Sequence, residues 1–125
     1  MDLICGNLTG SILGAAIKVH KALGPGLLES AYETCLQREL TLRGVKFQRQ
    51  VPLPVFYEGV RLDCGFRMDL IVEGLVVVEL KAVETLLPIH EAQLHTYLRL
   101  SGMRVGLLIN FNVRYLPEGV VRRVL

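Results

Sequence analysis

Hydrophobic side chains recur at helical spacing through the first third of the chain. Between residues 8 and 23 they fall three or four positions apart, and Asn7 or Thr9 is available to cap the helix. Gly24-Pro25-Gly26 ends this pattern, and a second helix is expected over about residues 27–43, with Gly44 suited to a left-handed C-terminal cap. The sequence therefore predicts two consecutive helices joined by a short turn.

The hydrophobic period changes to two after residue 45, and β-branched residues become frequent. Residues 45–55 and 60–72 are predicted to form strands joined around Tyr57-Glu58-Gly59, which is a turn signal. A third and more buried strand is expected over residues 75–82. These segments predict three consecutive strands after the two helices.

A further helix and strand complete the pattern. Pro88 is expected to begin a helix over about residues 89–101 that Gly102 ends, and the apolar run at residues 105–111 predicts a strand near the sheet centre. Residues 119–125 would add an edge strand. The predicted order is α-α-β-β-β-α-β, with one more strand at the end. We therefore expect one α/β or α+β domain over residues 1–125, with a mixed β-sheet flanked by helices.

Composition narrows the class of protein. Hydrophobic residues make up 51% of the chain and charged residues 21%, as in a domain with a buried core, and every apolar stretch is too short to span a bilayer. The first residues lack the basic start and apolar block of a signal peptide, and three scattered cysteines fit neither a zinc site nor a disulfide framework. We therefore expect a reduced, cytoplasmic protein with no membrane contact. The net charge of +2 does not decide whether the chain binds nucleic acid.

Charged residues interrupt the apolar segment at residues 67–81. Period-two alternation places Glu79 and Lys81 on one face of their strand, together with Val77. The face that Asp69 occupies depends on the connection between the two strands. A two-residue turn would put Asp69 and Glu79 on opposite faces, whereas a three-residue loop over residues 73–75 would pair them directly.

We predict the three-residue loop, or a bulge with the same effect. In that register the two carboxylates lie about 5 Å apart across a strand pair, and they could hold one hard divalent cation. The alternative is an ion-pair cluster of Asp69, Glu79 and Lys81 without a metal, because buried charges need either partners or a metal. These three residues alone favour neither interpretation.

Two helices carry further candidates. Glu29 and Tyr32 lie three positions apart, so Glu29 could supply a third carboxylate to the cation, or it could simply complement the helix dipole. Gln93 and Tyr97 lie four apart and could hold phosphate oxygens or orient the lysine, or they could pack against neighbours. His20 ends the first helix, where an imidazolium also favours the dipole.

Taken together, these residues resemble the GxxExxY family, a branch of the PD-(D/E)XK nuclease superfamily. Gly26, Glu29 and Tyr32 match the signature that names the family, and the likeness extends over nearly the whole chain. Asp69 and the tripeptide Glu79-Leu80-Lys81 match the D…ExK core of the superfamily, and residues 93–97 are similar to the QxxxY motif of RecB-like nucleases. The resemblance implies a restriction-endonuclease-like core.

The resemblance also implies hydrolysis of phosphodiester bonds with Mg²⁺ or Mn²⁺. The metal ligands it implies are Asp69, Glu79, the backbone carbonyl of Leu80, Glu29 and His20. Lys81 would hold the attacking water or stabilise developing charge, and Gln93 and Tyr97 would orient Lys81 or a phosphate, so the expected catalytic residues are Asp69, Glu79, Lys81, Gln93 and Tyr97. The expected substrate contacts are Tyr32, Gln93 and Tyr97.

Nucleic acid is the expected partner, DNA more than RNA. Small size favours a homo-oligomer, because one such domain covers little of a duplex. Two other classes compete with the nuclease hypothesis: a non-catalytic domain that keeps the fold and binds nucleic acid or a protein partner, and an accessory subunit that a partner completes. Cleavage that depends on Glu79 and Lys81 would distinguish the nuclease from both.

Overall fold

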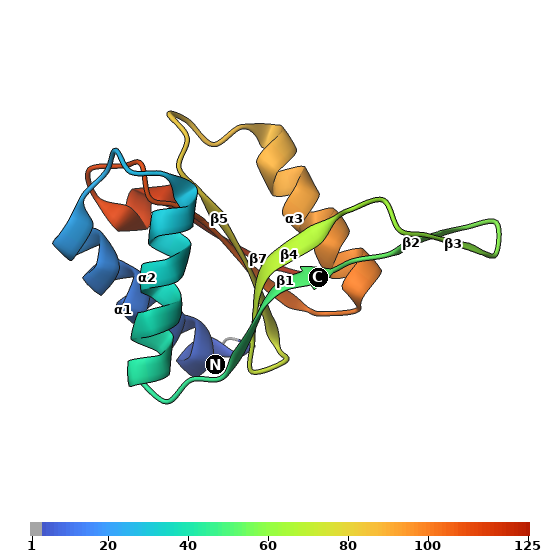
Figure 1. The fold of residues 1–125 in the computed structure, drawn as a ribbon, viewed down its shortest axis with the longest axis horizontal. Coiled ribbons are helices and arrows are strands. Elements are labelled where there is room, and N and C mark those ends of the chain that lie inside the picture. Colours follow the sequence, from blue (N-terminus) through green and yellow to red (C-terminus); the bar gives the residue numbers. More distant parts are fainter. Residues whose placement is uncertain (1–3) are drawn as a thin grey trace.

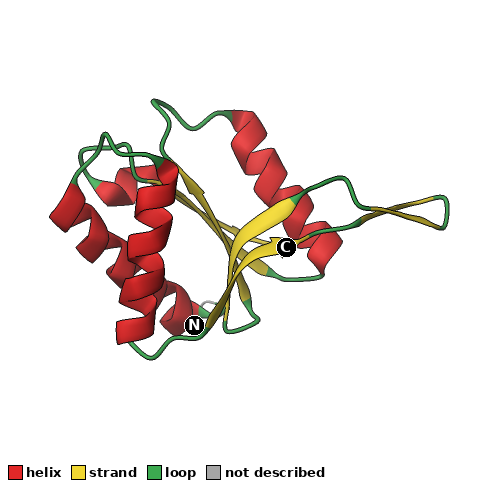
Figure 2. Cartoon of the chain, in the orientation of Figure 1, coloured by secondary structure: helices red, strands yellow, loops and turns green. Residues whose placement is uncertain are grey.

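A five-stranded sheet separates two layers of helices (Figure 1). The structure is a computed structural model and describes residues 4–125. Helices α1 (Gly6–Leu23) and α2 (Glu29–Leu42) pack together against one face of the sheet, and α3 (Pro88–Ser101) covers the other face. Figure 2 shows the same arrangement, with the strands running between the helices.

The sheet is mixed and has the strand order β1-β4-β5-β6-β7. Strands β5 and β6 run parallel on either side of the α3 crossover, and the other neighbouring strands are antiparallel. A short 3₁₀ helix, η1 (Leu116–Gly119), leads into the last strand. This architecture confirms the predicted α+β class and the predicted order of the α-helices and the strands of the main sheet. The sheet consists of β1 (Phe47–Pro52), β4 (Arg67–Val72), β5 (Val76–Lys81), β6 (Val105–Asn110) and β7 (Val120–Val124).

The strands expected over residues 45–55 and 60–72 are not continuous, and this part of the prediction is wrong. Pairing of β1 with β4 stops at Pro52 and Arg67, and a separate hairpin follows, formed by β2 (Val55–Tyr57) and β3 (Val60–Leu62). Prolines lack the N–H that a sheet ladder needs, and both Pro52 and Pro54 fall at the break.

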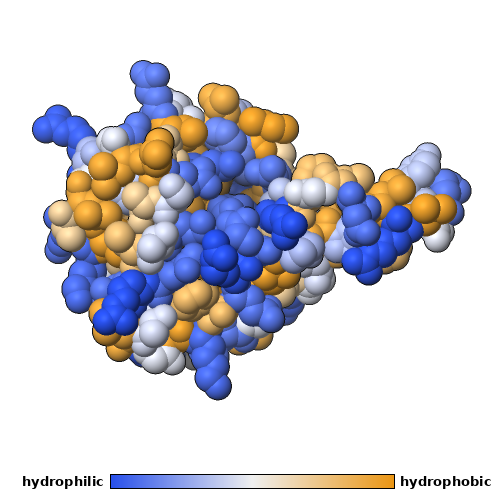
Figure 3. Space-filling model, viewed as in Figure 1, coloured by the Kyte–Doolittle hydropathy of each residue, from blue (hydrophilic) through white to orange (hydrophobic). Residues whose placement is uncertain are grey.

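The hairpin of residues 55–62 is called the arm below. Its turn residues Glu58 and Gly59 both have positive φ, the geometry that two-residue hairpin turns favour. At its base, the Leu53 N–H donates a hydrogen bond to the Phe66 carbonyl at 2.9 Å. Figure 3 shows the arm standing clear of the body, with hydrophilic and hydrophobic side chains on the visible side.

Alternation along β5 divides the core between the two helix layers. Val76, Val78 and Leu80 pack in the cluster that contains α1 and α2 residues, whereas Val77 packs in the cluster that contains Leu94 of α3. All four β5 valine and leucine side chains are fully buried. The predicted facing of this strand is confirmed.

The helix ends agree with most of the expected signals. Gly44 and Gly102 both adopt positive φ after their helices, and Pro88 begins α3. The first helix differs from the prediction. It begins at Gly6, directly after Cys5, and no side chain caps its N-terminus, so the predicted caps at Asn7 or Thr9 are wrong. Within residues 4–125 no helix combines the length and hydropathy needed to cross a membrane. The N-terminal residues from which we expected no signal peptide lie partly outside these described residues.

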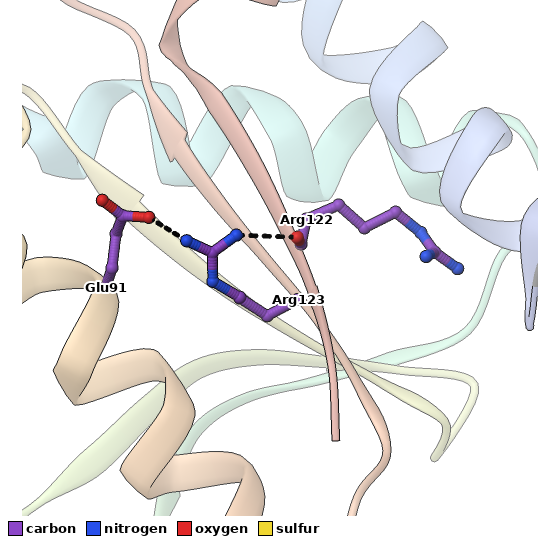
Figure 4. Close-up of polar contacts among 3 residues, drawn as sticks. All are labelled: Glu91, Arg122 and Arg123. Carbon is purple, nitrogen blue, oxygen red and sulfur yellow. Dashed lines mark hydrogen bonds and ion pairs between the residues drawn. The ribbon is translucent and has the colours of Figure 1, made fainter.

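Polar contacts tie the edge strand β7 to its surroundings (Figure 4). Arg123 Nη2 pairs with Glu91 Oε1 on α3, and Arg123 Nη1 donates a hydrogen bond to the Arg122 carbonyl at 3.3 Å. Arg122 in turn donates to the Ile4 carbonyl. Partly exposed ion pairs contribute at most about 1 kcal/mol, so these contacts position the strand more than they stabilise the fold. The expected edge strand at the C-terminus is confirmed.

Candidate active site

Pairing between β4 and β5 stops one position before Asp69 and Glu79. The last ladder pair is Leu70 with Val78, and residues 73–75 connect the strands. This is the three-residue loop predicted from the sequence. Continuing the register places Asp69 opposite Glu79 on one face of the sheet, so the predicted register is confirmed.

Asp69 also lies at a one-position interruption in the pairing of β4 with β1. The pairing of these strands skips Gln50 and Asp69, and Gln50 has a φ of 49°, which a residue other than glycine rarely adopts. The Gln50 side chain turns toward the acidic groups, because its Nε2 donates to Glu33 Oε1 at 2.8 Å and lies 3.5 Å from Asp69 Oδ1. The ladder is therefore interrupted on both sides of Asp69.

Carboxylates take the place of backbone partners in this gap. The Asp69 N–H donates a hydrogen bond to Glu79 Oε1 at 3.2 Å, and the Leu80 N–H donates one to Asp69 Oδ2 at 2.8 Å. On the other side of β5, the Lys81 carbonyl accepts a hydrogen bond from the Phe111 N–H. Since successive carbonyls of a strand point in opposite directions, the Leu80 carbonyl points to the β4 side, where Asp69 lies.

Burial and charge act together on Glu79, which is only 4% exposed. Burial, the charge of Asp69 and a hydrogen bond between the two side chains raise the pKa of Glu79 from 4.5 to about 9. The Asp69 backbone N–H and the charge of Lys81 act in the opposite direction but do not cancel the rise. At neutral pH and without a cation, Glu79 therefore keeps its proton beside Asp69.

Glu29 and Lys81 lie at the border of this pair. Partial burial and the charge of Asp69 raise the pKa of Glu29, and the charge of Lys81 lowers it. Lys81 thus lies near enough to influence both Glu29 and Glu79, yet within residues 4–125 it belongs to no ion pair. The N-terminus of α2 therefore brings a third carboxylate, and the end of β5 brings a free ammonium group, to the edge of the gap.

Gln93 and Tyr97 close the site on the α3 side. Gln93 Nε2 donates to the Tyr97 hydroxyl at 3.2 Å, as their spacing of four residues allows. Burial raises the pKa of Tyr97 first, followed by the charges of Glu79 and Asp69, so the phenol faces the carboxylates. The structure therefore brings together Glu29, Asp69, Glu79, Lys81, Gln93 and Tyr97.

Tyr32 and His20 are placed differently. Tyr32 is fully buried and stacks on Phe111, and its hydroxyl donates to the Gly24 carbonyl at 2.6 Å and accepts from the Leu27 N–H at 3.1 Å. Tyr32 fixes the turn that starts α2 and thereby positions Glu29. This buried position of Tyr32 does not fit its expected contact with substrate. His20 Nε2 lies 2.6 Å from the Val113 carbonyl, so its nearest polar partner is a loop and not the carboxylate pair.

The donor set at the gap suits a hard divalent cation. Two adjacent carboxylates and a backbone carbonyl offer only oxygen ligands, which Mg²⁺ and Mn²⁺ prefer. The raised pKa of Glu79 shows that a positive charge beside its carboxyl group is favoured. In the described residues, however, no three His, Cys, Asp or Glu side chains stand close enough to form a preassembled metal cluster. The residues present fit a cation that Asp69 and Glu79 would hold, with Glu29 near enough for its pKa to respond to the charge of Asp69.

Two contributors were not anticipated from the sequence. Glu33 lies four residues after Glu29 on the same helix face, and its charge contributes to the raised pKa of Glu29. That spacing was a usable signal. Gln50 gave no comparable signal, because its role depends on a left-handed backbone conformation that is not predicted for a glutamine.

Comparison with known proteins agrees with this geometry. A sheet with helices on both faces, two carboxylates at an opened strand pair and a lysine two residues beyond the second carboxylate define a restriction-endonuclease-like domain. The sequence profile of the PD-(D/E)XK nuclease superfamily matches residues 6–124, and the chain belongs to that superfamily. This membership indicates a nuclease type of function with nucleic acid as substrate. No curated protein and no solved structure matches the chain.

Proposed function

We propose that this protein is a metal-dependent nuclease that hydrolyses phosphodiester bonds, in DNA more than in RNA. The observation that carries the proposal is the raised pKa of Glu79 beside Asp69 in an interrupted strand ladder. A purely structural pair of this kind is costly, because a buried carboxylate without a partner charge destabilises the fold. Perturbed acids in such an opening are typical of functional sites.

The chain's own residues have separate parts in this reaction. Asp69, Glu79 and the Leu80 carbonyl would bind Mg²⁺ or Mn²⁺, and Glu29 would join them from the start of α2. When bound there, the cation lowers the pKa of a water and offsets charge on the phosphate. Lys81 would donate hydrogen bonds from its ammonium group to the attacking water or to a phosphate oxygen. Gln93 and Tyr97 would orient Lys81 or a phosphate through their hydrogen-bonded pair.

Several finer points belong to the same proposal. The match of Gly26, Glu29 and Tyr32 supports the GxxExxY branch, and the Gln93–Tyr97 pair supports a RecB-like site. We further propose a single domain that acts in the cytoplasm, and a homo-oligomer that covers more substrate than one copy could. His20 has no part in this scheme, because its contact with Val113 gives it a structural role.

The test is a cleavage assay with a matched set of variants. Purified protein with Mg²⁺ or Mn²⁺ should cleave labelled DNA. Glu79→Gln and Lys81→Met should each lower the rate by about 10²–10³-fold, as expected when a group that stabilises charge in the transition state is removed. Glu84→Gln is the control, because Glu84 is an exposed acid three residues beyond Lys81.

The outcomes separate the candidate functions. Equal cleavage by wild type and Glu79→Gln would mean that another site, or a contaminant, carries the activity. Tight binding of DNA without cleavage by any form would support the non-catalytic domain instead. Cleavage of RNA at a rate above that of DNA would overturn only the substrate preference.

A further inference from the structure

A cavity of about 390 Å³ lies between α3 and the base of the arm, next to the carboxylate pair. Pockets that hold small ligands begin at about this size. Phe66 and Tyr97 contribute two aromatic rings to its lining, with their ring centroids 6.5 Å apart in an edge-to-face arrangement. Tyr97 and Gln93 belong to both the cavity and the candidate active site, so the two spaces share a wall.

The polar groups of the cavity are few and distinct. Gln93, Thr96 and Arg99 lie among apolar side chains, and no acidic side chain of residues 4–125 lines the space. An amide and a hydroxyl can donate and accept hydrogen bonds, and an exposed arginine can contact a phosphate. Flat aromatic walls with a few hydrogen-bonding groups and a cationic rim suit a nucleobase and its phosphate.

The surroundings continue this surface along the arm. Alternation along the arm places Tyr57, which is 67% exposed, on the same face as Val55 of the cavity lining, whereas Phe56 and its cross-strand partner Arg61 occupy the opposite face. Phe66 is also partly exposed, where the chain returns from the arm into β4. Stacking side chains with interleaved arginines are the usual means of holding single strands.

Resting on the proposed nuclease function, we propose that this cavity is a subsite for an unpaired nucleobase, so that the protein engages single-stranded nucleic acid beside its carboxylate pair. The base would lie against Phe66, with its edge toward Gln93 and Thr96, and Arg99 would contact the adjoining phosphate. A base that is still paired in a duplex cannot enter such a cavity without leaving its stack. The scissile phosphate would then lie on the Tyr97 side.

The test uses a base analogue that fluoresces less when it stacks on an aromatic ring. A short single-stranded DNA that carries 2-aminopurine is titrated with the Glu79→Gln protein, which keeps the strand intact. The chain has no tryptophan, so the probe can be excited selectively. We expect quenching on binding, and an abasic version of the same strand should bind about tenfold or more weakly, since stacking contributes about 1–3 kcal/mol per base.

A filled cavity gives the matched comparison. Ala92 lines the cavity, is exposed and takes no part in the proposed chemistry, so Ala92→Phe should occupy the space and abolish quenching. His95→Phe adds a similar ring to an exposed position of the same helix that does not line the cavity, and it should quench like the parent. Circular dichroism of both variants checks that α3 remains folded.

Two results would overturn the subsite. One is equal affinity of the parent protein for the abasic and complete strands, with no quenching of 2-aminopurine by the parent or by His95→Phe. The other is a change of molar mass in Ala92→Phe but not in His95→Phe, because a second copy of the chain would then be the occupant. Wild-type cleavage without quenching would leave the nuclease proposal intact, whereas quenching without any cleavage would remove that proposal and leave the base subsite.

Discussion

The two halves of the β4–β5 pair differ in almost every respect, although they belong to the same two strands. Near the connecting loop, Leu70, Val72, Val76 and Val78 are fully buried and their backbones pair normally. One residue further on, the backbone pairing stops, and Asp69 and Glu79 fill the gap with side-chain hydrogen bonds. One half stabilises the fold, and the other half keeps a pair of acids close together at a cost to stability.

This contrast teaches how a small domain can keep a charged site. The apolar half and the helices around it supply the burial that offsets the unfavourable acids. The ladder is interrupted only beyond the paired apolar residues. The cost to stability is therefore confined to one position on each strand, Asp69 and Glu79. The two halves should therefore respond to different substitutions and conditions.

The largest expected effect is the pH dependence of stability without metal. Unfolded, Glu79 loses its proton near its ordinary pKa of 4.5, whereas the folded protein keeps the proton up to about 9. Between these values the folded state binds more protons, so the free energy of unfolding should fall as pH rises through this window. Urea denaturation in the presence of a chelator measures it. Glu79→Gln should flatten the slope, and Glu84→Gln should retain it.

A core change in the paired half should come next. Leu70→Ala removes a fully buried side chain and should lower the free energy of unfolding by about 2–5 kcal/mol. Because Asp69 and Glu79 keep their identities, cleavage per folded molecule should change little at a temperature where the variant is still folded. Loss of activity in fully folded Leu70→Ala protein would show that the two halves are not separable.

A divalent cation should stabilise the protein only through Asp69 and Glu79, in the opened half. Saturating Mg²⁺ or Mn²⁺ should stabilise the wild type by about 2–3 kcal/mol at a concentration near one hundred times the dissociation constant. The double variant Asp69→Asn, Glu79→Gln should show no such gain in thermal denaturation. An equal gain in both proteins would place the cation elsewhere on the chain.

The smallest effect concerns the turn that presents Glu29. Tyr32→Phe removes a hydroxyl that bonds the Gly24 carbonyl and the Leu27 N–H, and it should lower the free energy of unfolding by about 1–2 kcal/mol. Tyr115→Phe, at a position 63% exposed, is the control and should be neutral. Equal stability of the two variants would mean that the buried hydroxyl contributes nothing to this turn.

Much of the site could be predicted because strand alternation is strict. Once two strands carry charges at known positions, a three-residue loop or an equivalent bulge brings Asp69 and Glu79 onto one face, and the structure has the three-residue loop. Helical spacing was similarly sufficient for the contact between Gln93 and Tyr97. These local rules do not depend on the rest of the molecule.

The remainder depended on contacts that are remote in the sequence. Gln50 acquires its part through a left-handed backbone and a bond to Glu33, 17 residues away. Tyr32 was expected to contact the substrate, but it is buried, stacks on Phe111 and stabilises the fold. The arm was missed because two β-rich segments were read as continuous, although Pro52 and Pro54 already marked the break.

The left-handed backbone at Gln50 has a consequence for the behaviour of the protein at high concentration. Strand β1 is an outer strand of the sheet, and a straight outer strand offers a row of free N–H and carbonyl groups on which another chain can add, as in amyloid. The distortion at Gln50 and the proline at position 52 make β1 a poor template for such addition. The same irregularity that makes room for Asp69 thus also discourages aggregation along this side of the sheet.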